Sequence, residues 1–428
     1  MKAFTYLPLL LHLLFLPAVY LLTKRAKHEP LGKFLPWGWS IKVAAGWISV
    51  VVFKYYYHGS DLLHTFRQSM FLRAILLESP WRFWQFPYDM PQGDFYYLYG
   101  FPDLTPSFIF ICKTGALISL LTGQNIWLMS LWFSTLSFAG FWLLGNQLCR
   151  QFSSIKLSVV ISFFLVPSVA FWSAGIFKET LLWAYMSLMF WAGLQIVEKL
   201  SLQARPAFKE VALYATVLLL AGVGLFQVKY YVFAIAVVAL LFYFLLKLKK
   251  SRWIALTIGV ILLPFLFWVL GKLHFNLALD ELAIAIHRNY TRMVAISDAD
   301  NLIWLDLSPK LSSLIHQLPY AFKAAWFVPM PWQEGNWLKK LAGVENLTLL
   351  LLFLMVRFRW VELLKYLPEI LAALVFTISL ALLLALSAPN VGALARYKAS
   401  YLPLAWLLIC AGNPFLRTLS ISKLKAIF

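Results

Sequence analysis

A short segment directly after an apolar run carries residue types that do acid–base chemistry. Its sequence is HGSDLLH, in which Asp61 lies three residues after His58 and three residues before His64. Residues at this spacing share one face if the segment is helical. A carboxylate in a partly desolvated cleft serves as a general base or as a ligand of a divalent cation. We therefore expect Asp61 to be catalytic, with Mg²⁺ or Mn²⁺ as a candidate cofactor and the histidines as candidate substrate or metal ligands.

Two arginines, Arg67 and Arg73, follow the same segment. A guanidinium group binds an anionic phosphate through paired hydrogen bonds, so these arginines are candidate phosphate ligands. A structural alternative exists for Asp61, because Ser60 and Asp61 before an apolar stretch are also typical of a helix start. The sequence leaves both roles of Asp61 open.

Further carboxylates stand among tyrosines in the string PYDMPQGDFYYLYGFPD, which contains Asp89, Asp94 and Asp103. Aromatic faces stack on sugar rings while carboxylates accept hydrogen bonds from hydroxyl groups, so Asp94 and its neighbours are candidate sugar ligands. Turn formation explains these aspartates nearly as well.

Two other strings place ionisable groups at the ends of apolar runs. PSVAFWSAGIFKE ends in Lys178 and Glu179, and GALARYK contains Arg396 and Lys398. Ionisable groups at membrane depth are costly and tend to be functional, and the cations are candidate ligands of a phosphate. The alternatives are an ion pair that only stabilises the turn at Glu179, and cations that extend towards lipid headgroups at Arg396 and Lys398.

The elements that position these residues must be membrane helices. Of the 428 residues, 62% are hydrophobic and 13% charged, whereas soluble domains are about half apolar and a quarter charged. The apolar runs are continuous, which indicates helices and not the alternating strands of a barrel. Eleven spans are predicted, at 4–22, 38–56, 126–147, 157–174, 180–198, 210–227, 231–248, 253–273, 343–357, 366–387 and 398–412.

The basic residues predict the orientation of these spans. They concentrate in short loops and in the tail, all on one side if segment 107–122 does not cross the membrane. Basic loops face the cytoplasm, so the N-terminus is predicted outside, the C-terminus inside, and 107–122 as an interfacial helix on the outer face. The same distribution explains the net charge of +19 without a nucleic-acid partner.

Two long loops, 57–125 and 274–342, then face outward from a single transmembrane domain of residues 1–428. Both mix aromatic residues, prolines and scattered charges, as segments at a membrane interface do. The second contains an amphipathic stretch, 277–292, and a run rich in proline and tryptophan, 326–337. The outer face therefore carries every candidate site residue.

Together these strings resemble the GT-C superfamily of polytopic membrane glycosyltransferases. The resemblance lies in HGSDLLH, in the helix before Gly123, in PSVAFWSAGIFKE and in GALARYK, and the last two strings look like those of bacterial, Bacteroidetes-type members. One departure is an extra span before the one that leads into the acid-bearing loop.

The resemblance implies transfer of a sugar from a polyprenyl-phosphate carrier to an acceptor at the outer face of the bacterial inner membrane. Asp61 would be the base for the acceptor or a ligand of a divalent ion, and Arg396 and Lys178 would hold the carrier phosphate. Two other classes stay open from the residues alone: a lipid or polysaccharide transporter or flippase, and a non-catalytic membrane subunit. Paired halves and charges at the midplane, which transporters usually show, are not evident in the sequence.

Overall fold

The computed structural model describes residues 12, 15–57, 61–87, 105–202, 207–248, 251–357 and 364–416. Regular structure in these ranges is helical, apart from one isolated antiparallel bridge between Leu302 and Asn390. Six of the helices are long and apolar enough to cross a membrane. This is the architecture of an all-α membrane protein, as predicted, although these residues do not establish the expected number of about eleven spans.

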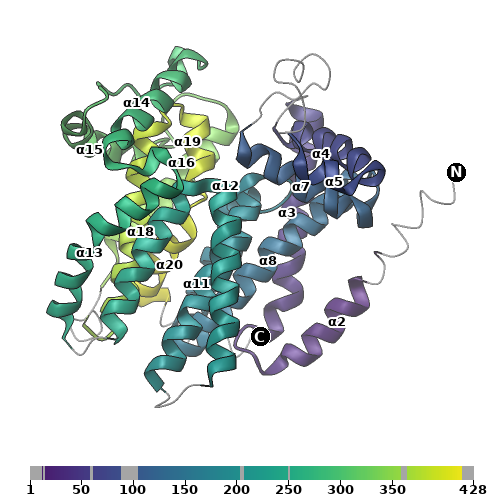
Figure 1. Ribbon diagram of the computed structural model, residues 1–428, viewed down its shortest axis with the longest axis horizontal. Coiled ribbons are helices and arrows are strands. Elements are labelled where there is room, and N and C mark those ends of the chain that lie inside the picture. The colour runs from purple at the N-terminus through teal and green to yellow at the C-terminus, as the bar shows by residue number, and fades with distance from the viewer. Residues whose placement is uncertain are drawn as a thin grey trace, which may run out of the picture.

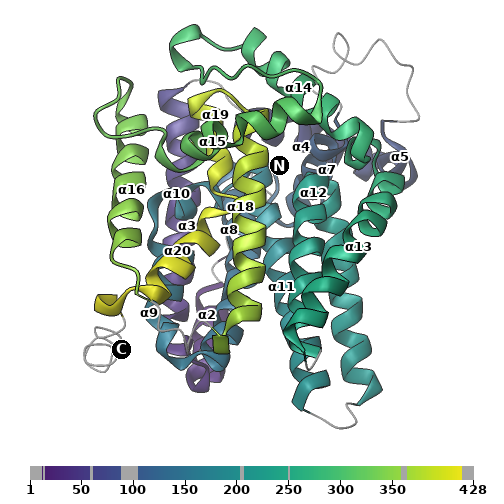
Figure 2. The ribbon, with the colours of Figure 1, turned by 90° about the vertical axis from the view of Figure 1, so that its left-hand side faces the viewer.

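The helices are arranged as an upright bundle with shorter helices gathered at one end (Figures 1 and 2). The long apolar helices are α3 (Leu35–Val51), α8 (Ile126–Gln151), α11 (Lys178–Leu202), α12 (Phe208–Leu248), α13 (Arg252–Leu273) and α18 (Leu367–Ser387). The remaining α-helices are α2 (Phe15–Arg25), α4 (Asp61–Glu78), α5 (Pro80–Gln85), α7 (Pro106–Thr122), α9 (Lys156–Val160), α10 (Pro167–Trp172), α14 (Leu279–Ala295), α15 (Leu311–Phe327), α16 (Trp337–Leu354), α19 (Val391–Lys398) and α20 (Leu402–Gly412).

Helix α12 is a hairpin of two legs. Its helical backbone is interrupted at Lys229, which has φ −153° and ψ 93°. Gly222 and Phe233 would be far apart on a straight helix, yet a Cβ atom on Gly222 would lie 3.1 Å from the Phe233 ring. The legs therefore fold back on each other, which matches the separate segments 210–227 and 231–248, and Lys229 lies at the tip.

Two of the predicted spans are wrong as continuous helices. Segment 157–174 is broken after the π-helical turn η5 (Ile161–Leu165), because Pro167 disfavours a helical conformation at Val166, whose ψ is 120°. Segment 398–412 contains only the short helix α20, which begins at Leu402 next to Pro403. Both breaks lie at prolines, where a helix starts readily but does not continue.

The two amphipathic or interfacial segments are helical. Residues 107–122 form α7, which packs against α4 and is not among the six candidate spans. Its placement relative to a membrane stays a prediction. Residues 277–292 lie mostly within α14, whose buried face includes Ala283, Ile286 and Tyr290. The predicted amphipathic helix is therefore confirmed.

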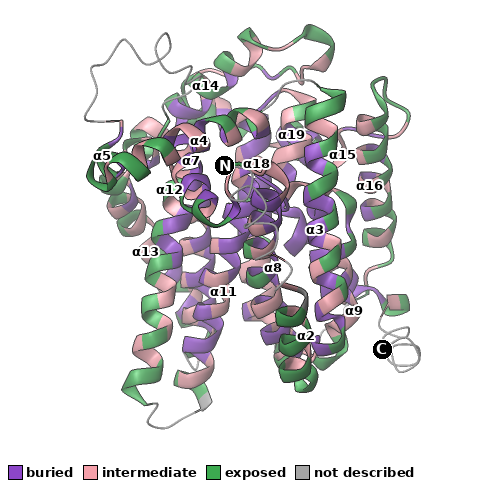
Figure 3. Cartoon of the chain, turned by 90° about the vertical axis from the view of Figure 1, so that its right-hand side faces the viewer, coloured by how far each residue is buried: buried purple, intermediate pink, exposed green. Residues whose placement is uncertain are grey.

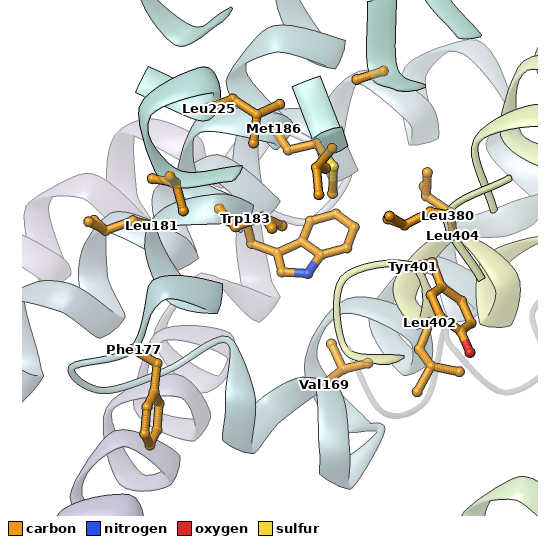
Figure 4. Close-up of a cluster of buried hydrophobic side chains, with 14 of the residues drawn as sticks. Val169, Phe177, Leu181, Trp183, Met186, Leu225, Leu380, Tyr401, Leu402 and Leu404 are labelled. Carbon is orange, nitrogen blue, oxygen red and sulfur yellow. The ribbon is translucent and has the colours of Figure 1, made fainter. Parts of the chain in front are cut away.

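The core of the bundle surrounds α11, which packs against α8 and α12 and is far more enclosed than α13 (Figure 3). Trp183 of α11 lies among aliphatic side chains beside Leu380 of α18 and Tyr401 (Figure 4). Its indole Nε1 donates a hydrogen bond of 2.6 Å to the carbonyl of Ala399. This contact ties α11, which carries Glu179, to the residues that follow α19, which carries Arg396.

Candidate active site

Four charged side chains form a continuous network at the end of the bundle where α4, α11 and α19 meet. Arg396 Nη1 lies 2.7 Å from Asp61 Oδ2, and Arg396 Nη2 lies 3.0 Å from Glu179 Oε2. Lys229 Nζ lies 3.1 Å from Glu179 Oε1. Two acids and two bases from four separate helices therefore meet at one place.

Glu179 is the centre of this network and its most enclosed member. Its side chain is 1% exposed, whereas that of Arg396 is 18% exposed and that of Asp61 is 74% exposed. Each Glu179 oxygen contacts one of the two cations, Lys229 through Oε1 and Arg396 through Oε2. A buried carboxylate persists only when it is paired and hydrogen-bonded, so Glu179 organises the network while Asp61 presents its outer end to solvent.

The guanidinium of Arg396 is held by aromatic faces as well as by acids. Its Cζ lies 5.5 Å from the ring centroids of both Trp172 and Phe177, within the range of a cation–π interaction. Burial by itself lowers the pKa of Arg396, but the adjacent Glu179 and Asp61 outweigh burial and raise that pKa above its ordinary value. Arg396 is therefore a permanent cation with a fixed orientation.

A cavity of about 220 Å³ opens beside Arg396. Its lining combines the Asp61 carboxylate and the guanidinium with apolar side chains: Phe53, Leu62, Trp172 and Phe177. The rings form a continuous wall, since the ring centroid of Phe53 lies 5.5 Å from that of Phe177 and 6.0 Å from that of Trp172. The cavity thus places one acid and one base at an otherwise aromatic surface.

The turn between α10 and α11 positions both the aromatic wall and Glu179. Gly175 has φ +75°, which favours glycine, and its amide donates a 2.9 Å hydrogen bond to Ser134 Oγ of α8. A Cβ atom at Gly175 would lie 2.5 Å from Ser49 Oγ of α3. The turn is therefore packed directly against two membrane helices.

Lys42 supports the same turn from α3. This lysine is completely buried. Its Nζ donates a hydrogen bond to Ser173 Oγ and lies 4.4 Å from the ring centroid of Phe141. Ser173 in turn donates to the carbonyl of Val169 in α10. Lys42 therefore fixes the turn that carries Trp172 and Phe177 without contacting the cavity itself.

A local distortion brings Phe53 to the cavity. The end of α3 continues as the π-helical turn η3 (Val52–Tyr56), a feature that often occurs at functional sites. The Phe53 ring also stacks on that of Tyr57, with 5.5 Å between the ring centroids. The Tyr57 ring meets that of Tyr56 edge to face, with 5.0 Å between the centroids. A row of rings therefore leads from Arg396 to the exposed tyrosines ahead of Asp61.

Asp61, Glu179 and Arg396 are thus brought together, but two other predicted residues point elsewhere. Lys178 Nζ donates a 3.1 Å hydrogen bond to Ser107 Oγ at the start of α7. Lys398 is buried and donates to the carbonyl of Val328. The pairing of Glu179 with Lys229 and Arg396 also realises the structural alternative of an ion pair at this turn, with partners distant in sequence.

The remaining predicted residues lie on α4 or outside the described ranges. His64 and Arg67 are exposed one and two turns after Asp61, so all three share the solvent face of this helix. The helix start predicted as an alternative for Asp61 is present, because α4 begins at that residue. His58 and Asp94 lie outside the described residues.

Sequence reasoning missed Lys229 and Lys42. Lys229 stands between the apolar runs 210–227 and 231–248, on the side where basic residues are otherwise scarce, and that signal could have identified it. Lys42 lies inside an apolar run, where a charge is expensive. Neither signal predicts the partner, because Glu179 is 50 residues from Lys229 in sequence.

The metal site predicted at Asp61 is not tested by the described residues, since His58 and Asp94 lie outside them. No group of three His, Cys, Asp or Glu side chains within these ranges is placed to hold a metal ion. The Oδ2 atom of Asp61 is moreover occupied by a guanidinium at 2.7 Å, which competes with a divalent cation for the same lone pairs. A divalent cation at Asp61 stays a prediction.

Comparisons with protein-family models, with curated proteins and with solved structures find no match for this chain.

Proposed function

We propose that this protein is a membrane glycosyltransferase that moves a sugar from a polyprenyl-phosphate carrier to an acceptor hydroxyl. The observation that supports the proposal best is the placement of Arg396, held by Glu179 and Asp61 at the edge of an aromatic cavity. An acid open to solvent beside a fixed cation supplies the two groups that displacement at an anomeric carbon requires.

In the proposed reaction Asp61 is the general base. Its carboxylate accepts the proton of the acceptor hydroxyl while that oxygen bonds to the anomeric carbon of the sugar. The bond between this carbon and the phosphate oxygen breaks, and its electron pair leaves with the carrier phosphate. Attack opposite to the leaving phosphate inverts the anomeric configuration, and the proton on Asp61 is then lost to solvent through its exposed side.

Arg396 is the proposed partner of the departing phosphate. A guanidinium has five N–H donors, and Glu179 and Asp61 engage only part of this set, through Nε, Nη2 and Nη1. Because Glu179 fixes the plane of the group, little reorganisation is needed when negative charge develops on the leaving oxygen. In this proposal the Asp61 contact loosens when the carrier phosphate arrives, which frees the base.

The aromatic wall suits the remaining parts of the substrates. Trp172, Phe177 and Phe53 offer apolar faces that can stack on a sugar ring. Tyr57 and Tyr56 extend these faces to the surface, where an acceptor would approach. A carrier lipid would reach the cavity from the plane of the bilayer, and we propose that this end of the bundle faces outward from the bacterial inner membrane.

The experiment uses the full-length protein in liposomes with polyprenyl-phosphate sugars and a membrane extract as acceptor source. Release of free polyprenyl phosphate, measured by mass spectrometry, reports transfer for any sugar in the panel. We expect Asp61→Asn to lower the rate by at least about a hundredfold, the usual contribution of a general base. Asp300→Asn, an exposed acid in the other long loop, is the matched control and should leave the rate unchanged.

Full activity of the Asp61→Asn variant would remove Asp61 from the mechanism. Uptake of the carrier or its sugar across the bilayer, without any covalent product, would instead favour the transporter or flippase class. A protein with neither activity would belong to the class of non-catalytic subunits.

A further inference from the structure

A second cavity, of about 190 Å³, lies at the other end of the bundle. Its wall is almost entirely apolar and comes from α8, α11, α12, α18 and α20, with Leu148, Phe190, Ala239, Ala373 and Leu407 among the lining side chains. The cavity lies between helices that cross the bundle, so its natural contents are apolar chains of the surrounding bilayer and not water.

This cavity is separate from the site around Arg396. The first turn of helix α18 contains Glu369 and lines the second cavity. The other end of α18 lies near α19, which carries Arg396. Its 21 residues span roughly 30 Å at 1.5 Å per residue. A single group bound at one end therefore does not contact the other end.

One charged pair lies at the cavity. Glu369 Oε1 pairs with Lys247 Nζ at 2.6 Å, across the gap between α18 and the second leg of α12. The other oxygen, Oε2, is buried and has no hydrogen-bond partner among the described residues. A buried carboxylate oxygen without a donor costs about 1–3 kcal/mol or more, so this atom points to a ligand that supplies an N–H or O–H group.

We propose that the second cavity binds an aminophospholipid of the adjacent leaflet, with one acyl chain among the apolar side chains and the headgroup ammonium on Glu369 Oε2. The headgroup carries a phosphate next to its ammonium. Lys247 supplies a cation beside Glu369, and Arg252 follows within the same basic loop. The site thus offers an acid and a base side by side, as a zwitterionic headgroup requires.

The charges of Glu369 and Lys247 favour an aminophospholipid over phosphatidylglycerol. A phosphatidylglycerol headgroup would place hydroxyls and a negative phosphate here. Its hydroxyls could donate to Oε2, but they would bring no positive charge to the Glu369 carboxylate. A hydrogen bond between an ammonium and a carboxylate also carries the attraction of two opposite charges, which a hydroxyl donor lacks. We expect this difference to favour the aminophospholipid by roughly tenfold in affinity. We therefore expect a resident aminophospholipid that stabilises the helix contacts and is not consumed in the reaction.

The test is native mass spectrometry of the delipidated full-length protein in detergent, titrated with phosphatidylethanolamine or phosphatidylglycerol of identical acyl chains. The wild type should bind one phosphatidylethanolamine at least about tenfold more tightly than phosphatidylglycerol. Glu369→Gln should reduce this preference to near unity. Ala373→Phe, which fills the cavity, should weaken both lipids equally.

Glu210→Gln is the matched control. Glu210 also pairs with a lysine, Lys199, near the same end of the bundle, but it is half exposed and does not line the cavity. Equal binding of the two lipids by the wild type, or a preference that survives in Glu369→Gln, would overturn the proposal. So would a Glu210→Gln variant that loses the preference as completely as Glu369→Gln. Melting curves confirm that each variant is folded, and no glycosyl transfer enters the readout.

Discussion

Glu179 accepts two hydrogen bonds from Arg396 on one oxygen, at 3.1 Å from Nε and 3.0 Å from Nη2. The two residues are 217 positions apart, and their contact joins the start of α11 to the short helix α19. Because Glu179 is almost completely buried and Asp61 is mostly exposed, the two acids that flank the guanidinium have different physical roles. The first holds the structure, and the second is the acid that we propose meets the substrate.

The first prediction separates these roles by stability. Glu179→Gln leaves the buried Lys229 without a counter-charge and Arg396 with only the exposed Asp61, so it should lower the free energy of unfolding by about 3–5 kcal/mol. Asp61→Asn removes one exposed partner and should cost no more than about 1 kcal/mol. Denaturation in detergent, followed by intrinsic tryptophan fluorescence, measures both. Equal losses would contradict the assignment of Glu179 as the structural centre.

A second prediction concerns the aromatic wall. Trp172→Leu removes a face that contacts Arg396, and a desolvated cation–π interaction contributes about 2 kcal/mol. We expect the KM for the polyprenyl-phosphate sugar to rise about tenfold or more, while Trp172→Phe recovers most of the loss. Trp253→Leu, on an exposed tryptophan of α13, is the control. An unchanged KM in Trp172→Leu would exclude this wall from substrate binding.

The turn before α11 gives a third prediction. Gly175→Ala forces a side chain into a positive-φ conformation and against Ser49 Oγ, at a cost of about 1–3 kcal/mol for the backbone strain. Adding Ser49→Ala should relieve the steric contact but not the strain, so the double variant should recover only part of the melting temperature. Complete recovery would mean that the backbone conformation at Gly175 is not strained by a side chain.

Lys398 gives a prediction on pH. Burial lowers the pKa of Lys398 to about 7, against a smaller opposite effect of Glu345, whereas the unfolded chain has the ordinary value of about 10.4. Between these values the unfolded state binds more protons, so stability should rise with pH from about 7 upward, by at most about 1.4 kcal/mol per pH unit. Lys398→Met should lose this rise when melting temperatures are compared from pH 6 to 9.5. If the melting temperatures of the two proteins changed in parallel with pH, Lys398 would be protonated in the folded state throughout this range.

The sequence predicted the class of fold and three members of the charged network. Asp61, Glu179 and Arg396 could be identified because charge at the end of an apolar run is costly and therefore informative. Their neighbours Lys178 and Lys398 carried the same signal but lie on other sides of their helices, because residues one or two positions apart do not share a helix face. Local sequence thus identified the helix ends but not the direction of each side chain.

Two further features could not be predicted from the same patterns. The hydropathy of segment 157–174 is continuous, so its break depends on the conformation that Pro167 imposes on the residue before it. The aromatic wall depends on contacts between α3 and α10, since Phe53 and Trp172 are far apart in sequence. Such long-range packing has no periodic signature within a single helix.

The hairpin of α12 has a consequence for the order in which the chain assembles. During synthesis Glu179 is made first and Lys229 follows after 50 residues, so a partner for the acid becomes available as soon as the hairpin is complete. Arg396, in α19, is made long after Lys229. A ribosome-bound chain can therefore bury Glu179 together with Lys229 before Arg396 is made and joins Glu179 to Asp61. The tip lysine thus acts as a provisional counter-ion, and the charged network is complete only once α19 has been made.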